Sequence, residues 1–155
     1  PTANPIAMQT ALQQADLVVV PVRVGPHDLK AVGPTLDLCD RAGKPIVFVL
    51  NAVPAHGHMV DVVATALSQH GSVMPHWISQ DTGLADAMVD GLTIMETDPD
   101  CDVSRTIDRL WEQLCQRADT NFRRTIFNTA AIGGFAAPHR AAPIGFGRRQ
   151  IGPHG

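Results

Sequence analysis

Two short apolar runs dominate the pattern of hydrophobic and polar positions along the chain. The first covers residues 17–22 and the second covers residues 45–50, and both are built mostly from β-branched side chains. Neither run has a polar face, and both are too short for a core helix, which is typical of strands buried on both faces of a parallel sheet. We therefore predict an α/β fold in which these two strands lie side by side and point the same way.

The segment between the two runs has the apolar spacing of a helix. Parallel strands need such a crossover connection, and we expect this helix to cover residues 28–42, with Gly43 just beyond its end. Pro34 lies inside the pattern and removes one backbone hydrogen bond, so a kink or a late start is expected. The unit is thus predicted to be a strand, a helix and a second strand.

Weaker patterns predict the elements around this unit. Asn4 followed by Pro5 is typical of a helix start, with a capping side chain and then a proline at the first helical position. Pro75 suits the edge of a sheet better than its centre, because it cannot donate a hydrogen bond. The elements predicted from these patterns are helices over residues 4–14, 58–70 and 84–90, an edge strand over residues 73–78, and a short extended piece over residues 92–95.

A last amphipathic helix is predicted to begin after Asp102, whose side chain can cap its first turn. From about Asp119 the apolar residues follow no period, and glycine and proline punctuate the sequence, so residues 119–155 are expected to be disordered. The side chains of this helix that are expected to face the core are Val103, Ile107, Leu110, Trp111 and Leu114.

The composition is that of one globular domain. The chain has 155 residues, of which 45% are hydrophobic. No apolar run approaches the roughly 18 residues that a membrane-spanning helix needs, and the first residues lack the order of a signal peptide, so a cytoplasmic location without a membrane partner is expected. Cys39, Cys101 and Cys115 are widely spaced and are interpreted as buried thiols. His56 and His58 have a spacing that metal ligands use, but without a third ligand nearby they are interpreted as exposed loop residues.

The charge is distributed unevenly along the chain. Residues 119–155 carry five arginines and one acid, a net charge of +4, so residues 1–118 carry −7 of the total of −3. We therefore expect a folded domain over residues 1–118 and a flexible Gly/Pro/Arg-rich tail over residues 119–155. Such a tail can attract nucleic acid or another acidic surface, although a solvated end is the commoner explanation.

A series of short sequence pieces follows the strands and helices predicted for residues 1–117. The pieces are, in order, Ala15-Asp16-Leu17-Val18-Val19-Val20-Pro21-Val22-Arg23, Asp28-Leu29, Ala42-Gly43-Lys44-Pro45, Val49-Leu50-Asn51, Pro54, Ala87, Gly91, Glu96, Pro99 and Ile107-Leu110-Trp111. In this order they resemble the second half of ParA-type partition ATPases, the deviant Walker-A family that also includes MinD-like ATPases. The order of the pieces, and no single one of them, carries the resemblance.

The resemblance implies a parallel-sheet P-loop fold that binds ATP and Mg²⁺ and forms a homodimer around two nucleotides. It also implies that the ATP-bound protein holds DNA without sequence preference, in the cytoplasm and on the nucleoid. A ParB-like partner protein would stimulate hydrolysis, and the cycle would segregate plasmids or chromosomes.

Two features of that family have no counterpart in this sequence. No G-x-x-x-x-G-K-[ST] run and no Lys-Gly-Gly variant of the phosphate loop occurs, and the Asp that acts near Mg²⁺ would precede Pro1. The chain is therefore expected to be a carboxyl-terminal portion of such an ATPase, with no catalytic residues and no ATP hydrolysis, because phosphoryl transfer depends on groups that the loop positions. One edge of the first strand would then lack a neighbour, which predicts self-association.

The resemblance places the base-binding end of a nucleotide site after the second strand. Asn51 matches the adenine-contacting Asn of the family, whose amide can donate to and accept from the purine edge. By propensity alone, a strand-end residue that caps a turn is the better explanation of Asn51, and the resemblance raises the adenine role to equal standing. The family often has an Arg after the third strand, where this chain has Gln80-Asp81-Thr82. The remaining residues predicted to line the adenine site are Pro54, Ile78, Ser79, Gln80 and Asp81.

Charged side chains supply two further candidate sites. Arg23 and Asp28 flank the turn after the first strand and could contact phosphate or a second subunit, although solvated charges or an exposed ion pair explain them equally well. Arg105, Arg109 and Arg117 are predicted near one face of the last helix, where they could approach a DNA backbone. Acidic residues interleave with them, so a solvated helix with local ion pairs is the favoured interpretation.

Two functional alternatives stay open beside the partition ATPase. The first is a non-catalytic ParA-like adaptor or dimer-partner module. The second is a relative in the same broad P-loop class, such as a cobyrinic-acid amide-forming enzyme, for which the sequence offers no candidate glutamine-handling residues.

Overall fold

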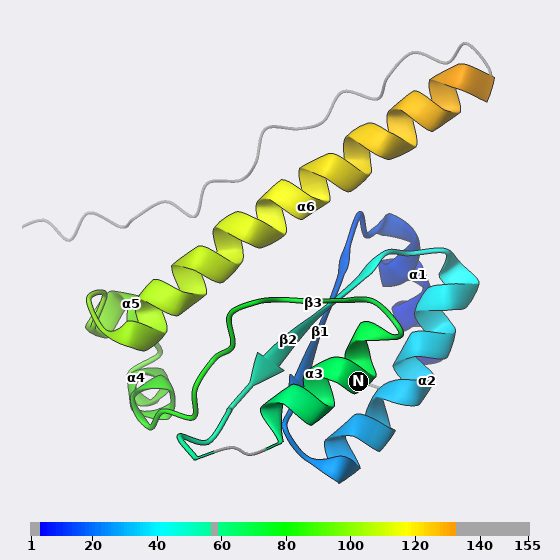
Figure 1. Cartoon of the computed structure of the whole chain (residues 1–155). Coiled ribbons are helices and arrows are strands. Elements are labelled where there is room, and N and C mark those ends of the chain that lie inside the picture. Colours follow the sequence, from blue (N-terminus) through cyan, green and yellow to red (C-terminus); the bar gives the residue numbers. More distant parts are fainter. Residues whose placement is uncertain (1–3, 57–58, 133–155) are drawn as a thin grey trace, which may run out of the picture.

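The structure of the chain is a computed structural model that describes residues 4–56 and 59–132. Its centre is a three-stranded sheet in the order β1-β2-β3 (Figure 1). β1 (Val18–Arg23) and β2 (Ile46–Asn51) are parallel and in register from their first residue to their last. β3 (Ser72–Val73) pairs in parallel with the other side of β2. The predicted pair of parallel strands is therefore confirmed, with each strand shifted by one residue.

The crossover helix is α2 (Pro26–Ala42), which connects β1 to β2. Gly43 follows it with a φ of 61°, the left-handed conformation expected there, and its N–H donates to Asp40 O at 3.0 Å. The late start expected from Pro34 is wrong, because the helix begins at Pro26 and continues past Pro34. Pro34 is exposed, so water can bond the carbonyl that the proline ring leaves without a donor.

The first helix, α1 (Pro5–Gln14), lies against α2 (Figure 1). Its predicted start is confirmed, since Asn4 Oδ1 accepts a hydrogen bond from Ala7 N at 3.1 Å. At its other end, Lys44 Nζ donates to Gln13 O at 2.9 Å, so a residue that precedes β2 neutralises part of the negative carboxyl end of the helix.

Helices cover both faces of the sheet. α2 and α3 (Val60–Ser68) pack on one face, while α6 (Asp102–Ile132) crosses the other. Successive residues of a strand point to opposite faces, so Phe48 and Leu50 of β2 enter the first layer while Val47 and Val49 enter the second. β2 is therefore buried on both faces, as predicted.

β1 differs from β2 because only one of its faces is fully covered. Val20 and Val22 belong to the core beneath α2 and α3, whereas Val19 on the opposite face is 42% exposed. Within the described residues, β1 is an outer strand of the sheet and α6 lies mainly over β2. The prediction that β1 is buried on both faces is therefore wrong for the face that carries Val19.

The outer edge of β1 lacks one backbone donor. Val18 N–H donates to Pro45 O at 2.9 Å, so Val18 and every second residue after it direct their backbone groups toward β2. The intervening residues, which include Pro21, direct theirs outward. Proline has no N–H, and a proline at a free edge reduces pairing with other strands. The predicted self-association stays a prediction, and Pro21 opposes it.

The third strand is shorter than predicted and is interrupted. Met74 N–H still donates to Phe48 O at 2.8 Å, but residues 75–77 then loop out, and Ile78 N–H makes the next bond to β2 at Leu50 O, at 2.9 Å. In an uninterrupted strand, His76 would make that bond. The predicted edge position of this strand is confirmed, whereas its predicted continuous course over residues 73–78 is wrong.

Two short helices follow. α4 (Gly83–Val89) agrees with the predicted helix to within one residue. The extended piece predicted for residues 92–95 is wrong, because α5 (Ile94–Thr97) forms there with a capping box. Thr93 N–H donates to Glu96 Oε2 at 2.9 Å, and this bond, with one from the Thr93 hydroxyl, lowers the pKa of Glu96.

The start of α6 depends on Cys101 and Ser104. Asp102 is the first helical residue and pairs with Arg105 at 2.8 Å, so its predicted role as the cap is wrong. The Sγ of Cys101 accepts from Ser104 N at 3.4 Å, and the buried Ser104 hydroxyl donates to Asp98 O at 2.7 Å. The three cysteines are free, as predicted, with Cys39 buried and the others partly buried.

α6 is longer than predicted. It has 31 residues and ends at Ile132, so the disorder predicted from Asp119 is wrong for residues 119–132. The glycines and prolines that suggested disorder all lie at or after Gly133, and residues 133–155 lie outside the described part of the chain. None of the described helices, α6 included, is both long and apolar enough to cross a membrane.

Trp111 does not face the core. The structure buries Val103 and Leu110 and partly buries Ile107 and Leu114, as predicted, but Trp111 is 62% exposed. It projects from the side of α6 that overhangs β1, where a groove with a volume of about 470 Å³ separates the helix from Val19. Burial of Trp111 would need further cover over this groove, for example from another strand beside β1.

The burial of β2 predicts a steep dependence of stability on Phe48, whose side chain has no exposed surface. Replacing Phe48 by Ala should lower the free energy of unfolding by about 3–5 kcal/mol, because it removes buried apolar surface and leaves a cavity. Urea denaturation followed by circular dichroism measures this. Ile6→Ala, at a side chain that is 76% exposed, should change stability by less than about 1 kcal/mol. Equal losses would contradict the assignment of the core.

The edge of β1 gives a second prediction. Pro21→Thr restores the missing outward N–H and should shift the chain toward dimers and larger species at a given concentration. Size-exclusion chromatography with light scattering measures this shift. Val19→Thr on the same strand leaves the backbone donors unchanged and should behave as the parent chain does. An unchanged mass for Pro21→Thr would show that the edge is protected in another way.

Candidate functional site

The candidate site lies at the carboxyl ends of the strands, where ligands of open parallel sheets bind. The last residues of β1 and β2 are Arg23 and Asn51, which lie opposite each other. The segment after β3 reaches the same edge, because Ile78 N–H donates to Leu50 O. Three separate parts of the sequence therefore meet at this edge.

A left-handed residue ends β2. Ala52 has a φ of 49°, which is unusual for a residue with a side chain, and it breaks the alternation of the strand. Its N–H is satisfied by the side chain of Asn51, whose Oδ1 lies 2.9 Å away. This bond supports the interpretation of Asn51 as a strand-end residue that stabilises a turn. It uses one lone pair of Oδ1, and within the described residues the side-chain Nδ2 has no hydrogen-bond partner.

The turn at Ala52 redirects Val53 toward the segment after β3. Val53 N–H donates to Ile78 O at 3.0 Å, and Gln80 N–H donates to Val53 O at 2.9 Å. These bonds form an isolated parallel bridge between Val53 and Ser79. The two loop segments that were predicted to share one site are therefore joined directly by backbone hydrogen bonds.

The bridge also decides which backbone groups stay available. The bridge uses the C=O of Ile78 and the N–H of Gln80, and the N–H of Ile78 is used by Leu50 O of β2. The alternation of the backbone directs the N–H and C=O of Ser79 to the other side. Asp81 Oδ1 accepts from Gly83 N at 2.8 Å and so fixes the start of α4. Pro54 follows the bridge and is exposed. Within the described residues, Ser79 therefore keeps its backbone N–H and C=O available for a ligand.

Arg23 and Asp28 lie at the turn that follows β1, at the same edge. Among the described residues no ion pair joins them. The carboxylate of Asp28 instead folds back over Gly25, where an added Cβ would come within 2.8 Å of its Oδ2. Asp28 belongs to the first turn of α2, where a negative charge favours the positive end of the helix.

Asp81 also borders an acidic pocket between α4, α5 and the start of α6. The pocket has a volume of about 350 Å³, and Asp86, Asp90 and Asp98 contribute to its walls. Across the described residues, no group of three or more His, Cys, Asp or Glu side chains is arranged to hold a metal ion. His58 lies outside the described residues, so the His56/His58 pair is not defined here.

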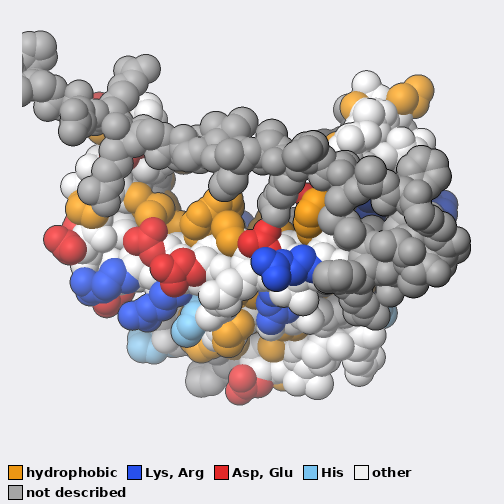
Figure 2. All heavy atoms as spheres, turned by 90° about the horizontal axis from the view of Figure 1, so that it is seen from above, with side chains coloured by type: hydrophobic (Ala, Val, Ile, Leu, Met, Phe, Trp, Pro, Cys, Tyr) orange, Lys and Arg blue, Asp and Glu red, His pale blue; other side chains and the backbone are white. Residues whose placement is uncertain are grey.

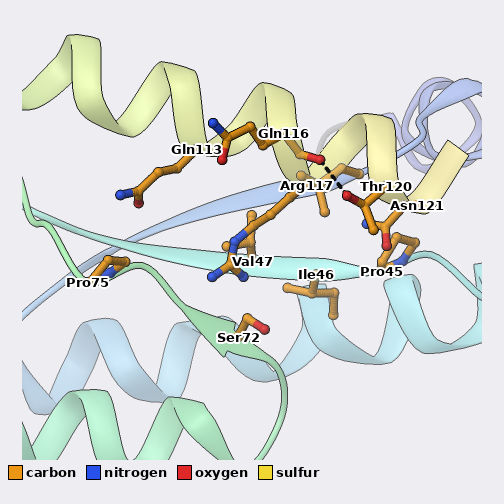
Figure 3. Close-up of a pocket in the computed structure, with 11 residues that line it drawn as sticks. Pro45, Ile46, Val47, Ser72, Pro75, Gln113, Gln116, Arg117, Thr120 and Asn121 are labelled. Atoms are coloured by element: carbon orange, nitrogen blue, oxygen red, sulfur yellow. Dashed lines mark hydrogen bonds between the residues drawn. The ribbon is translucent and has the colours of Figure 1, made fainter. Parts of the chain in front are cut away.

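The structure separates the three arginines that were predicted for DNA. Arg105 is exposed and pairs with Asp102, and this hydrogen bond raises the pKa of Arg105. Arg109 is exposed, whereas Arg117 is partly buried and lines a pocket beneath α6 (Figure 3). On the face in Figure 2, acidic and basic side chains are mixed, and no continuous basic patch appears among the coloured atoms.

The sequence predictions missed two features of these sites. The left-handed Ala52 carries no local signal, since alanine does not favour that conformation. The pocket around Arg117 combines residues from the start of β2, from β3 and from α6. In the sequence, this pocket was indicated only by the polar residues Gln113 and Gln116 of α6.

No model of a known protein family matches this chain, and no curated protein sequence matches it. The resemblance to ParA-type ATPases therefore depends on the residues quoted from the sequence.

The strained turn at Ala52 can be tested directly. Ala52→Gly should raise the free energy of unfolding by about 0.5–1 kcal/mol, because glycine adopts a positive φ without steric cost. The midpoint of urea denaturation measures this. Ala55→Gly, in the same loop but without a positive φ, should leave stability unchanged or lower it. A loss of stability in Ala52→Gly would show that the turn is not strained.

Proposed function

We propose that this chain forms the base-binding portion of a ParA-type partition ATPase and recognises the adenine of a bound nucleotide at the carboxyl edge of its sheet. The observation that carries this proposal is the backbone bridge between Val53 and Ser79, which holds the loops 51–54 and 78–81 side by side at the end of a parallel sheet. The parallel pairing of β1 and β2 and the position of Asn51 at the end of β2 also support it.

The chemistry of Asn51 suits a purine edge. One lone pair of its Oδ1 is held by Ala52 N–H, which fixes the plane of the amide. The second lone pair and the two Nδ2 hydrogens stay available, so the amide can accept from the amino group of adenine and donate to a ring nitrogen. The outward backbone groups of Ser79 are further partners, and Pro54 offers an apolar surface.

The proposal for these residues is limited to binding of the base. The sequence contains no phosphate loop, and the described residues offer no carboxylate set for Mg²⁺. In this family, the phosphate loop would hold the phosphates and Mg²⁺. The residues at the carboxyl edge of the sheet, such as Asn51 and Ser79, are therefore not assigned a role in hydrolysis. A nucleotide-linked homodimer, a ParB-like partner and a role in plasmid or chromosome partitioning belong to the proposal on the strength of the resemblance.

Association with DNA would depend on the two exposed arginines of α6. Arg109 is the stronger candidate, since Arg105 is already paired with Asp102. The net charge of −7 over residues 1–118 opposes DNA, so binding would be weak and sensitive to salt. A non-catalytic adaptor or dimer-partner module is the second candidate function, and the open groove between Trp111 and Val19 favours it.

Nucleotide binding tests the proposal. ATP that carries an N-methylanthraniloyl group on its ribose should bind the chain with a rise in fluorescence, and both ATP and adenosine should displace it better than GTP or ribose 5-phosphate do. Asn51→Ala should weaken binding by about tenfold or more, because it removes the hydrogen bonds to the base. Gln9→Ala, at an exposed amide on α1, is the control and should bind as the parent chain does.

A second variant separates recognition from folding. Asn51→Asp keeps an oxygen that can accept from Ala52 N–H but loses the amide hydrogens, so it should stay folded and bind the fluorescent nucleotide as weakly as Asn51→Ala does. Displacement by GTP as effective as displacement by adenosine, or undiminished binding by Asn51→Asp, would overturn the proposal.

A further inference from the structure

A pocket lies beneath α6 at the amino ends of β2 and β3, the opposite end of these strands from the nucleotide edge (Figure 3). It has a volume of about 550 Å³, within the range of small-molecule sites. The start of β2, the segment 72–75 and α6 each supply part of its wall. Its lining residues are Leu17, Pro45, Ile46, Val47, Ser72, Pro75, Gln113, Gln116, Arg117, Thr120 and Asn121.

Among the described residues that line it, the pocket has one positive charge and no negative charge. Arg117 is the charged residue of this lining, which otherwise consists of hydroxyl, amide and apolar side chains. In the described part of the chain, no carboxylate lies within 4.0 Å of the Arg117 guanidinium. The nearest acid along α6, Asp119, lies on the other side of the helix, where it borders the groove beside β1.

The position of Arg117 fits a ligand-binding role. Its side chain leaves α6 and extends across the pocket above Val47 toward Ser72 (Figure 3). The guanidinium carries five N–H donors in a planar fork that matches a carboxylate or a phosphate, and partial burial strengthens its need for an acceptor. An arginine whose methylene groups only cover apolar surface would extend its guanidinium into water. Hydrogen-bonding side chains around the guanidinium would then not be needed.

We propose that this pocket binds a small organic anion with one carboxylate or phosphate group and an apolar body. Arg117 holds the oxyanion as a bidentate partner, and Ser72 and Gln113 supply neutral hydrogen bonds beside it. The apolar body packs on the wall formed by Leu17 and Ile46. The Thr120 hydroxyl already donates to Gln116 O at 2.8 Å, so it offers the ligand an acceptor and not a donor.

The geometry favours a small ligand over a DNA backbone. Arg117 lies below α6 and partly buried, whereas a duplex would need an exposed row of cations. Arg105 and Arg109 are exposed nearer the amino end of α6 and do not line this pocket. The pocket does not share any residue with the edge at Asn51 and Ser79. A negative result for adenine binding would therefore leave this proposal unaffected, and the reverse also holds.

Three matched probes test the proposal and distinguish its two possible oxyanions. Benzoate, phenyl phosphate and the neutral benzamide share one ring and differ in the group offered to Arg117. Titration of the full chain by two-dimensional NMR should show saturable shifts for benzoate or phenyl phosphate, with benzamide at least tenfold weaker. The tighter of the two anions identifies the preferred oxyanion. Equal binding of benzamide, or no saturable binding of either anion, would overturn the proposal.

Variants assign the binding to this pocket. Arg117→Gln removes the charge and leaves a shorter polar side chain, and it should weaken binding of the anion by at least tenfold. Gln113→Glu places a negative charge beside Arg117 and should have a similar effect without removing the arginine. Arg109→Gln, on the same helix but outside the pocket, is the control and should bind within twofold of the parent chain. Thermal denaturation checks that each variant is folded.

Two outcomes would assign Arg117 differently. If Arg109→Gln weakened anion binding as much as Arg117→Gln does, the effect would be one of net charge. That result would overturn the assignment of the binding to this pocket. A short DNA duplex that displaces the anion, and that loses affinity in Arg117→Gln, would overturn the small-ligand proposal and assign Arg117 to the phosphate backbone of DNA.

Discussion

The parallel pairing of β1 with β2 is the constraint from which the rest of the structure follows. Because the two strands are in register from end to end, their carboxyl ends meet at one edge and their amino ends at the other. β2 then needs apolar cover on both faces, which α2 and α3 supply on one side and α6 on the other. The position of α6 above β2 in turn creates a groove along each side of the helix.

The two grooves differ because the sheet differs on either side of β2. Toward β1 the helix overhangs an outer strand, and most side chains that line the groove are apolar, with Val19 and Trp111 exposed. Toward β3 the strand is short and interrupted, so polar side chains of α6 reach the amino ends of the strands and enclose Arg117. Pro21 and the looped residues 75–77 thus have related effects, since each limits backbone pairing at one border of the sheet.

The sequence predicted those elements whose signals are local and periodic. Two apolar runs, the capping Asn4 and the terminal Gly43 were sufficient for the strands and the helices before and between them. Trp111 was misplaced because its burial depends on how far the sheet extends, which the helix pattern does not contain. The end of α6 was misplaced because residues 119–132 were grouped with the glycines and prolines that follow them, although that segment contains neither. The Thr93/Glu96 box was a local signal that was overlooked.

The candidate site was predictable as a set of segments but not as a geometry. Pattern and resemblance placed Asn51 and residues 78–81 at one edge, and the bridge at Val53 brings them there. The left-handed Ala52 that makes this bridge possible has no sequence signal of its own. Its N–H would be left without a partner if Asn51 did not supply Oδ1. Asn51 therefore has a structural role and free hydrogen-bonding groups at the same time, and the first role orients the groups that a base would contact.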